Sequence, residues 1–217
     1  MALDRELVVR TALRLMDATG IDGLTLRKIA AELNVQAPAL YWHFKNKQAL
    51  IDAMATTVLL DVAEEAGLPA TGDQWREHSA AYMRALRRGL LAHRDGAKVF
   101  SGTHLDDARM YDVMEAGLAL MTEAGFGTAD AALAMNTLYC FTVGFAVEEQ
   151  AVHPRPGEAD ERYEPAARAE RIGAEERPRM AAAGEALFGD FDARFETGLQ
   201  IVLAGIDARR GQLTPGN

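Results

Sequence analysis

Cysteine is nearly absent from the chain, since Cys140 is the only one among 217 residues. One cysteine excludes a disulfide framework within the chain and a zinc finger with cysteine ligands. The longest uncharged stretch, residues 131–147, is short for a membrane helix and contains polar residues, so it predicts a buried helix. The N-terminus lacks the basic segment and apolar run of a signal peptide, and we therefore expect a cytoplasmic protein.

Strand signals are also missing. The chain contains no alternating β-branched run and no Asn-Gly turn, whereas alanine, leucine, methionine, glutamate and arginine dominate. This composition predicts an all-α fold. Hydrophobic residues at 49% and charged residues at 25% are typical of a soluble globular protein.

Negative charge is concentrated after residue 60. The chain has a net charge of −9, yet residues 1–60 carry seven basic and six acidic side chains. A slightly basic N-terminal part on an acidic remainder favours a small DNA-binding head joined to a body with another role.

Capping residues and periodicity predict eight main helices. We expect a first helix from Asp4 to Thr19, stopped by Gly20, and a fourth from Asn46 to Glu65. The others are expected at residues 25–33, from Pro38, and at 73–92, 106–124, 128–152 and 186–208. Residues 153–180 are charged and hold four of the seven prolines, which predicts a mobile surface loop with room for a short helix inside.

The second and third predicted helices have the lengths and the short connection of a helix-turn-helix. Leu40 and Phe44 would then pack inward and leave an aromatic surface formed by Tyr41, Trp42 and His43. The start of the third helix, Gln36, Ala37, Pro38 and Ala39, would lie nearest to base edges, with Arg27, Lys28, Lys45 and Lys47 placed to meet phosphates. A helical trio that does not bind DNA has the same spacing, so the spacing alone leaves both possibilities open.

The run from Gly20 to Ala30, followed by Leu40-Tyr41-Trp42-His43 and Lys45-Asn46-Lys47, resembles the head of the tetracycline repressor (TetR) family. The resemblance continues through residues 93–99, Gly102-Thr103 and residues 141–148, and is close to the tetracycline-responsive members. It implies a dimeric repressor that binds a palindromic operator and is released by a small inducer. It implies a helix-turn-helix domain at 1–46, a connecting helix at 47–65 and a ligand-binding and dimerisation domain at 66–217. It also adds Thr25 to the DNA-binding residues, and Ala37 and Ala39 replace a glutamine and a threonine.

The body departs from the tetracycline-responsive pattern. The histidine that coordinates the drug-bound magnesium ion is replaced by Phe100, which offers no donor to a hard cation. The resemblance therefore implies a mostly apolar or aromatic inducer other than magnesium–tetracycline, and no cofactor of the protein's own. The implied ligand-binding residues are Leu60, Tyr82, Leu86, Phe100, Thr103, His104, Leu105, Met114, Leu118, Met135, Asn136, Tyr139 and Glu148. Residues of a hydrophobic core that binds no ligand would show the same apolar and aromatic residues at the same helical spacing.

Two further expectations concern assembly and signalling. The helices near 128–152 and 186–208 are apolar on more than one face, which favours a four-helix bundle across a two-fold axis over a monomer core. Gly96 in a short helix would let a bound ligand shift the 93–103 segment, and with it the connecting helix and the separation of the heads. A buried Glu148 would need a hydrogen-bond donor.

An all-α metal-dependent hydrolase is the alternative from another class, because His93 and His104 each lie two residues before an aspartate. The chain lacks a His-Asp dipeptide, a nucleophile elbow and a phosphate-binding loop. Cys140, between two aromatic residues, is expected to be an inert core thiol. We therefore expect no enzyme activity. A DNA-binding regulator without a small-molecule ligand remains possible from sequence.

Overall fold

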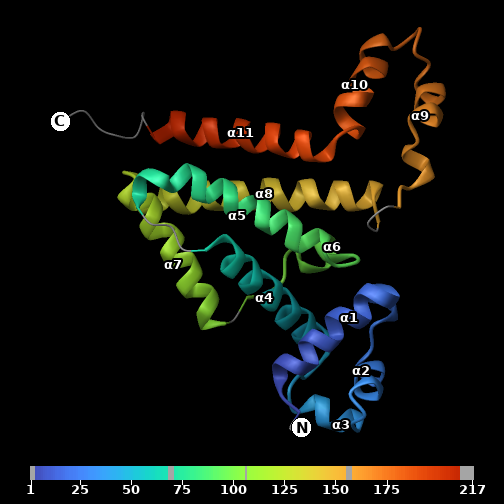
Figure 1. Cartoon of the computed structure of the whole chain (residues 1–217), viewed down its shortest axis with the longest axis vertical. Coiled ribbons are helices and arrows are strands. Elements are labelled where there is room, and N and C mark those ends of the chain that lie inside the picture. Colours follow the sequence, from blue (N-terminus) through green and yellow to red (C-terminus); the bar gives the residue numbers. More distant parts are fainter. Residues whose placement is uncertain (1–2, 68–70, 106, 155–157, 211–217) are drawn as a thin grey trace. The chain divides into compact units, whose positions relative to one another are not determined.

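The structure, a computed structural model, describes residues 3–67, 71–105, 107–154 and 158–210 (Figure 1). These residues are predominantly helical and contain no strand, which confirms the all-α prediction. Contacts divide the chain into two compact units, Met1–Ala132 and Leu133–Asn217, and each is described by itself. The eighth helix begins in the first unit and ends in the second.

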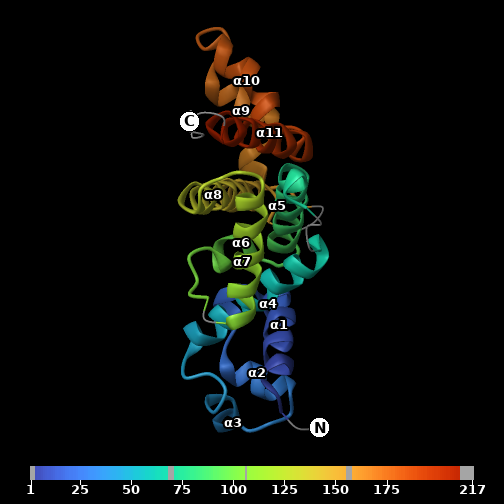
Figure 2. The same cartoon turned by 90° about the vertical axis from the view of Figure 1, so that its left-hand side faces the viewer.

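The first unit opens with α1 (Arg5–Gly23), α2 (Leu26–Glu32) and α3 (Ala37–Tyr41), in which α2 packs against both α1 and α3, and α1 packs against α4 (Figures 1 and 2). As expected, Asp4 caps α1, because its carboxylate accepts a hydrogen bond from the Leu7 amide at 3.0 Å. The predicted end at Gly20 is a kink, where φ is +71°, and a last turn follows before Leu24. Leu24 is buried and anchors this turn to the core.

The rest of the first unit is built on α4 (Lys47–Ala66), which packs against α1, α5, α6 and α7. Asn46 caps α4 as predicted, since its side chain accepts from the Ala49 amide at 2.8 Å. The other elements are η1 (Gly72–Gln74), α5 (Trp75–Leu91), α6 (Gly96–Phe100) and α7 (Ala108–Glu123). The predicted start of the last of these, residue 106, lies outside the described residues. Asp107 instead caps α7.

The second unit contains the main part of α8 (Thr128–Val152) with η2 (Glu161–Tyr163), α9 (Pro165–Ile172), α10 (Pro178–Phe188) and α11 (Phe191–Arg210). The prediction for residues 153–180 was wrong in its extent of helix, because η2 and the start of α10 lie there besides α9, the short helix that the sequence allowed. Both helices begin at a proline, which suits the first turn although it breaks a helix interior. The guanidinium of Arg168 lies 5.0 Å from the ring of Phe188 and joins α9 to α10.

The prediction of one last helix over 186–208 was also wrong. The chain breaks between Phe188 and Phe191, and Asp190 begins a new helix by accepting a hydrogen bond from the Ala193 amide at 3.0 Å. The apolar spacing runs across this break, because Phe188 and Phe191 both face packed neighbours. Periodicity alone therefore could not reveal the separate helices.

The helix α8 is long and apolar enough to cross a membrane by length and composition, and 39% of its apolar window is buried. Core helices of soluble proteins meet the same criterion. Within the second unit, Phe141 stacks on Phe195 with ring centroids 5.6 Å apart, and Phe145 meets the same ring edge-on at 5.1 Å. Cys140 lies off this packed face and is exposed, so the expectation of a core thiol was wrong.

Candidate DNA-binding and ligand-binding sites

The outward face of α3 is aromatic. Leu40 and Phe44 are 0% and 1% exposed, as the inward packing predicted, whereas Tyr41 is 57% and Trp42 91% exposed. Burying Leu40 and Phe44 holds the short helix in place, and the guanidinium of Arg5 covers the Phe44 ring at 5.0 Å. An exposed tryptophan next to an exposed tyrosine forms an apolar surface that a partner would cover.

The N-terminal turn of α3 carries the residues expected to lie nearest to base edges. Gln36 precedes the helix and makes no capping hydrogen bond, so its amide is available to a base. Pro38 is exposed, while Ala37 and Ala39 are half-buried. His43 is half-buried too, with its ring 6.5 Å from that of Phe44, so it faces outward less than predicted.

Three residues predicted to contact DNA also hold the turn between α1 and α2. Thr25 caps α2 by accepting from the Lys28 amide at 3.2 Å. The ammonium of Lys28 donates to the Gly23 carbonyl, and that of Lys47 to the Ile21 carbonyl, each at 2.7 Å. Sequence reasoning missed this role, because free carbonyls at a helix end are visible only once the helix end is known. Arg27 is exposed and makes no hydrogen bond or ion pair within the described residues.

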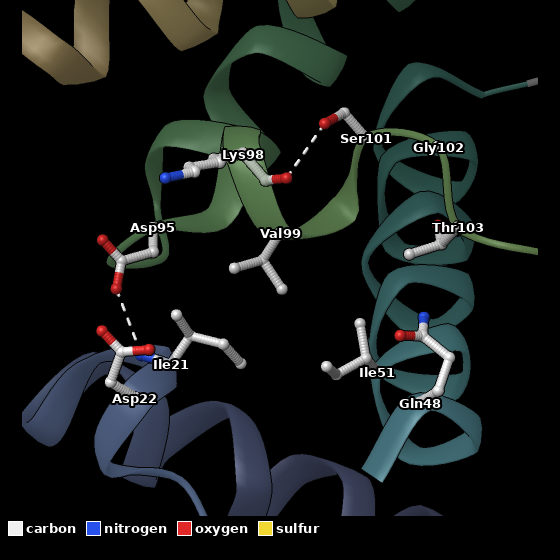
Figure 3. Close-up of a pocket in the computed structure, with 10 residues that line it drawn as sticks. All are labelled: Ile21, Asp22, Gln48, Ile51, Asp95, Lys98, Val99, Ser101, Gly102 and Thr103. Carbon is white, nitrogen blue, oxygen red and sulfur yellow. Dashed lines mark hydrogen bonds between the residues drawn. The ribbon is translucent and has the colours of Figure 1, made fainter.

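A polar junction ties α1 to the turn that precedes α6. The Asp17 carboxylate accepts from the Arg94 amide at 3.1 Å, and both of its oxygens lie 3.1 Å from Nδ1 of His93. One turn further along α1, the Ile21 amide donates to the Asp95 carboxylate at 3.1 Å (Figure 3). We call these contacts the α1–α6 junction. From sequence, His93 and Asp95 stood out only through the family resemblance and as doubtful metal ligands, and their contacts with α1 were not predicted.

Backbone geometry at the α1–α6 junction depends on two left-handed residues. Asp95 has φ +61°, a conformation that aspartate tolerates better than most residues. Gly20 has φ +71°, and a Cβ there would lie only 3.2 Å from the Asp95 carboxylate. The close approach of α1 to this turn therefore requires glycine at position 20.

The expected ligand-binding residues of the first unit lie on α4 and on three helices that pack against it, α5, α6 and α7, or, for Thr103, His104 and Leu105, in the loop between α6 and α7. Leu86 and Phe100 are buried, with Phe100 1% exposed and its ring 6.0 Å from that of His93. Leu60, Tyr82, Thr103, Leu105 and Leu118 are half-buried, and His104 and Met114 are exposed. The structure thus buries or half-buries seven of these nine residues, and their binding role stays a prediction.

The remaining expected ligand residues, Met135, Asn136, Tyr139 and Glu148, lie on α8 in the second unit. Burial raises the pKa of the half-buried Tyr139 phenol above its usual range, so this hydroxyl stays protonated at neutral pH. Glu148 is exposed, and the expectation that it is buried and needs a donor was wrong. The helical register instead buries its neighbour Glu149, which is 9% exposed.

Comparisons with known proteins cover both parts of the chain. A family model described as "Bacterial regulatory proteins, tetR family" matches residues 8–54, and one described as "Tetracyclin repressor-like, C-terminal domain" matches residues 68–210. The tetracycline repressor protein class A from transposon 1721 of Escherichia coli is 40% identical over 205 residues, which cover 94% of this chain and 90% of that protein.

Solved structures show the same similarity. A possible TetR family transcriptional regulator from Streptomyces coelicolor A3(2) has 43% identity and a TM-score of 0.81, over 94% of this chain and 99% of the other. The S. coelicolor protein ActR in complex with actinorhodin has 29% identity and a TM-score of 0.82, over 97% of this chain and 100% of the other. The chain therefore belongs to the tetracycline repressor family of ligand-responsive transcriptional repressors, which are DNA-binding proteins and not enzymes.

Proposed function

We propose that this chain acts in the cytoplasm as a homodimer whose two heads bind a palindromic operator and which a small, mostly apolar or aromatic inducer releases. The observation that carries the DNA-binding part is the surface of α3, where Trp42 is 91% exposed above a buried Leu40. A two-fold protein dimer would present two such surfaces to half-sites about one helical turn apart, roughly 34 Å.

The inducer is not expected to be magnesium–tetracycline. Phe100 stands where the tetracycline-responsive pattern has a metal-binding histidine, and its buried phenyl ring offers no nitrogen or oxygen donor. Among the described residues, no group of three or more His, Cys, Asp or Glu side chains could hold a metal ion. Phe100 therefore does not fit the role of a ligand to the magnesium ion, and the family gives the hydrolase alternative no support.

The class of inducer follows from the residues expected to line the site. Leu86, Phe100 and Leu118 provide apolar surface, and Thr103 provides a polar group that would fix orientation. ActR, a relative of this chain, is solved with actinorhodin, and a tetracycline repressor variant from Acinetobacter baumannii is solved with minocycline. We propose a polycyclic aromatic compound of comparable size as the inducer of this chain.

The dimer proposal rests on exposed apolar surface in the second unit. Leu133 on α8 is 61% exposed and Ile201 on α11 is 68% exposed, while Phe195 and Leu199 hold the inner face of α11. Two helices that remain apolar on their outer faces would bury those faces in a four-helix bundle with a second copy.

Selection of bound DNA from a random pool, followed by a compound screen for release, tests the proposal. We expect a palindromic consensus, a two-subunit mass by light scattering, and release by polycyclic aromatic compounds. Magnesium–tetracycline is expected to leave the operator bound. A consensus without two-fold symmetry, or a single-subunit mass, would contradict the proposal.

Arg27 offers a direct test of the phosphate contacts. Replacing Arg27 with alanine is expected to weaken binding to operator and random DNA by a similar factor, and to lower the salt slope by about one. Stability should not change, because this exposed guanidinium makes no hydrogen bond or ion pair within the described residues. Arg76→Ala in α5 is the charge-matched control, and fluorescence anisotropy at several salt concentrations is the measurement. Loss of affinity for the operator alone would instead assign Arg27 to a base contact.

We propose that the α1–α6 junction carries the inducer signal to the head, because it joins α1 to the turn beside Phe100. Asp95→Gly keeps the left-handed backbone but removes the side-chain oxygen that accepts from the Ile21 amide. Asp95→Asn keeps the left-handed backbone and also keeps an accepting side-chain oxygen. We expect the Ile21 amide of Asp95→Gly to exchange with solvent about fivefold faster, with wild-type exchange in Asp95→Asn. In titrations with a compound that releases the operator, Asp95→Gly should need a higher concentration than the wild type for the same release, although its affinity for the compound is unchanged. Asp95→Asn should need the wild-type concentration. Equal release by both variants would place the coupling elsewhere.

A further inference from the structure

A cavity lies within the first unit, between the end of α1, the first turns of α4, and α6 with the loop that follows it (Figure 3). Its volume is about 460 Å³, which falls in the size range of small-molecule sites. Thr103 is the only residue of its lining that also belongs to the expected inducer-binding set. The cavity is therefore a separate candidate site.

The centre of the cavity is aliphatic. Ile21 from α1, Ile51 from α4 and Val99 from α6 point toward one another across the empty space in Figure 3. All three side chains are half-buried, so part of their apolar surface remains in contact with water. A guest with a short apolar body would remove this surface from water.

Most hydrogen-bond donors of the polar side chains around this aliphatic centre are already engaged in hydrogen bonds within the protein. The Ser101 hydroxyl donates to the Lys98 carbonyl and the Thr103 hydroxyl to the Phe100 carbonyl, each at 2.9 Å. The amide nitrogen of Gln48 donates to the Asp52 carboxylate at 2.9 Å. These side chains therefore offer oxygen acceptors to the cavity.

Two carboxylates stand at the α1 side of the cavity. Asp22 makes no hydrogen bond or ion pair within the part of the chain that the structure describes, and Asp95 uses one oxygen for the Ile21 amide. The Lys98 ammonium extends along the α6 side, away from the aliphatic centre (Figure 3). The cavity thus combines free acceptors and negative charge with an apolar centre.

We propose that this cavity binds a small amine, whose protonated ammonium group lies at Asp22 and Asp95 and whose short apolar body packs against Ile21, Ile51 and Val99. An ammonium group donates to the carboxylate oxygens and to the other acceptors of the rim, where Lys98 is the one cation among the lining residues, and it keeps its charge at neutral pH. A neutral alcohol of the same shape gains only the apolar contact, and a carboxylate is repelled by the two aspartates.

Methyl-resolved NMR on the full chain, without DNA, tests this site with benzylamine, benzyl alcohol and benzoate as probes. We expect benzylamine to shift the methyl signals of Ile21, Ile51 and Val99 saturably, benzyl alcohol to bind more weakly, and benzoate to shift none. Because no DNA is present, the result is independent of operator binding and of the proposed inducer.

Asp22→Asn provides the decisive variant, because this exposed side chain keeps its shape and loses its charge. Benzylamine is expected to bind about three- to fivefold more weakly to Asp22→Asn, and unchanged to Asp112→Asn, an exposed aspartate on α7. Lys98→Gln should tighten benzylamine binding, since it removes the competing positive charge. Equal affinity for benzylamine and benzyl alcohol, or no effect of Asp22→Asn, would overturn the proposal.

Discussion

Replacing Trp42 with alanine is expected to weaken operator binding by about thirtyfold. Tryptophan is among the residues that contribute most at interfaces, where losses of about 2 kcal/mol are common. Because Trp42 is 91% exposed and packs against little in the free chain, its removal should leave the free energy of unfolding within about 0.5 kcal/mol of wild type. Anisotropy with a labelled operator, together with urea unfolding, measures both quantities.

The control for this variant is Tyr111→Ala. Tyr111 lies on α7, outside the head, and is 55% exposed, so its truncation also removes a large exposed aromatic ring. Operator affinity should be unchanged in this control. If both variants bind equally well, the aromatic surface of α3 does not contact DNA, and the assignment of the DNA-reading helix fails.

Gly96→Ala is expected to destabilise the fold by about 2 kcal/mol. A Cβ at position 96 would lie 2.4 Å from the carbonyl oxygen of Leu90 and 3.0 Å from Cβ of His93, and the first of these is backbone that yields little. The sequence suggested Gly96 as a flexible point in a short helix. The structure shows instead a buried glycine that permits the α5–α6 turn to close.

Thermal unfolding at fixed protein concentration measures this effect, with a fall in Tm of roughly 6 °C expected. Gly127→Ala is the control, because its Cβ would meet only the Asp130 carboxylate at an ordinary 3.6 Å. If Gly96→Ala had the Tm of the wild type, the α5–α6 turn would accommodate the added methyl group. The role of Gly96 would then be the flexibility that the sequence suggested. Altered induction in Gly96→Ala is interpretable only alongside this measurement.

Local sequence signals predicted the helices of the head well, because the residues that cap and end a helix are neighbours in the sequence. Asp4 and Asn46 each accept the amide hydrogen bond expected of a helix cap. The inward positions of Leu40 and Phe44 followed from their four-residue spacing. Residues close in sequence were sufficient for each of these predictions.

Features that depend on distant partners could not be predicted in the same way. The contact of Asp17 with His93 joins residues 76 apart, and no periodicity reports such a pair. The start of α10 at Pro178 was missed because prolines that begin helices resemble prolines that break them. Exposure of Cys140 and Glu148 depends on the rotation of α8 about its own axis, which a helix apolar on several sides leaves undetermined.

The engaged lysines of the head have a consequence for how the protein searches a genome. The ammonium groups of Lys28 and Lys47 already hold backbone carbonyls, and the Arg10 guanidinium holds Asp61. Among the described cations of the head, Arg27 and Lys45 make no hydrogen bond or ion pair, and the chain as a whole is acidic, so its affinity for random DNA should be low even in dilute buffer. Little of the protein would be sequestered on the bulk chromosome, and discrimination would come mainly from contacts in the groove.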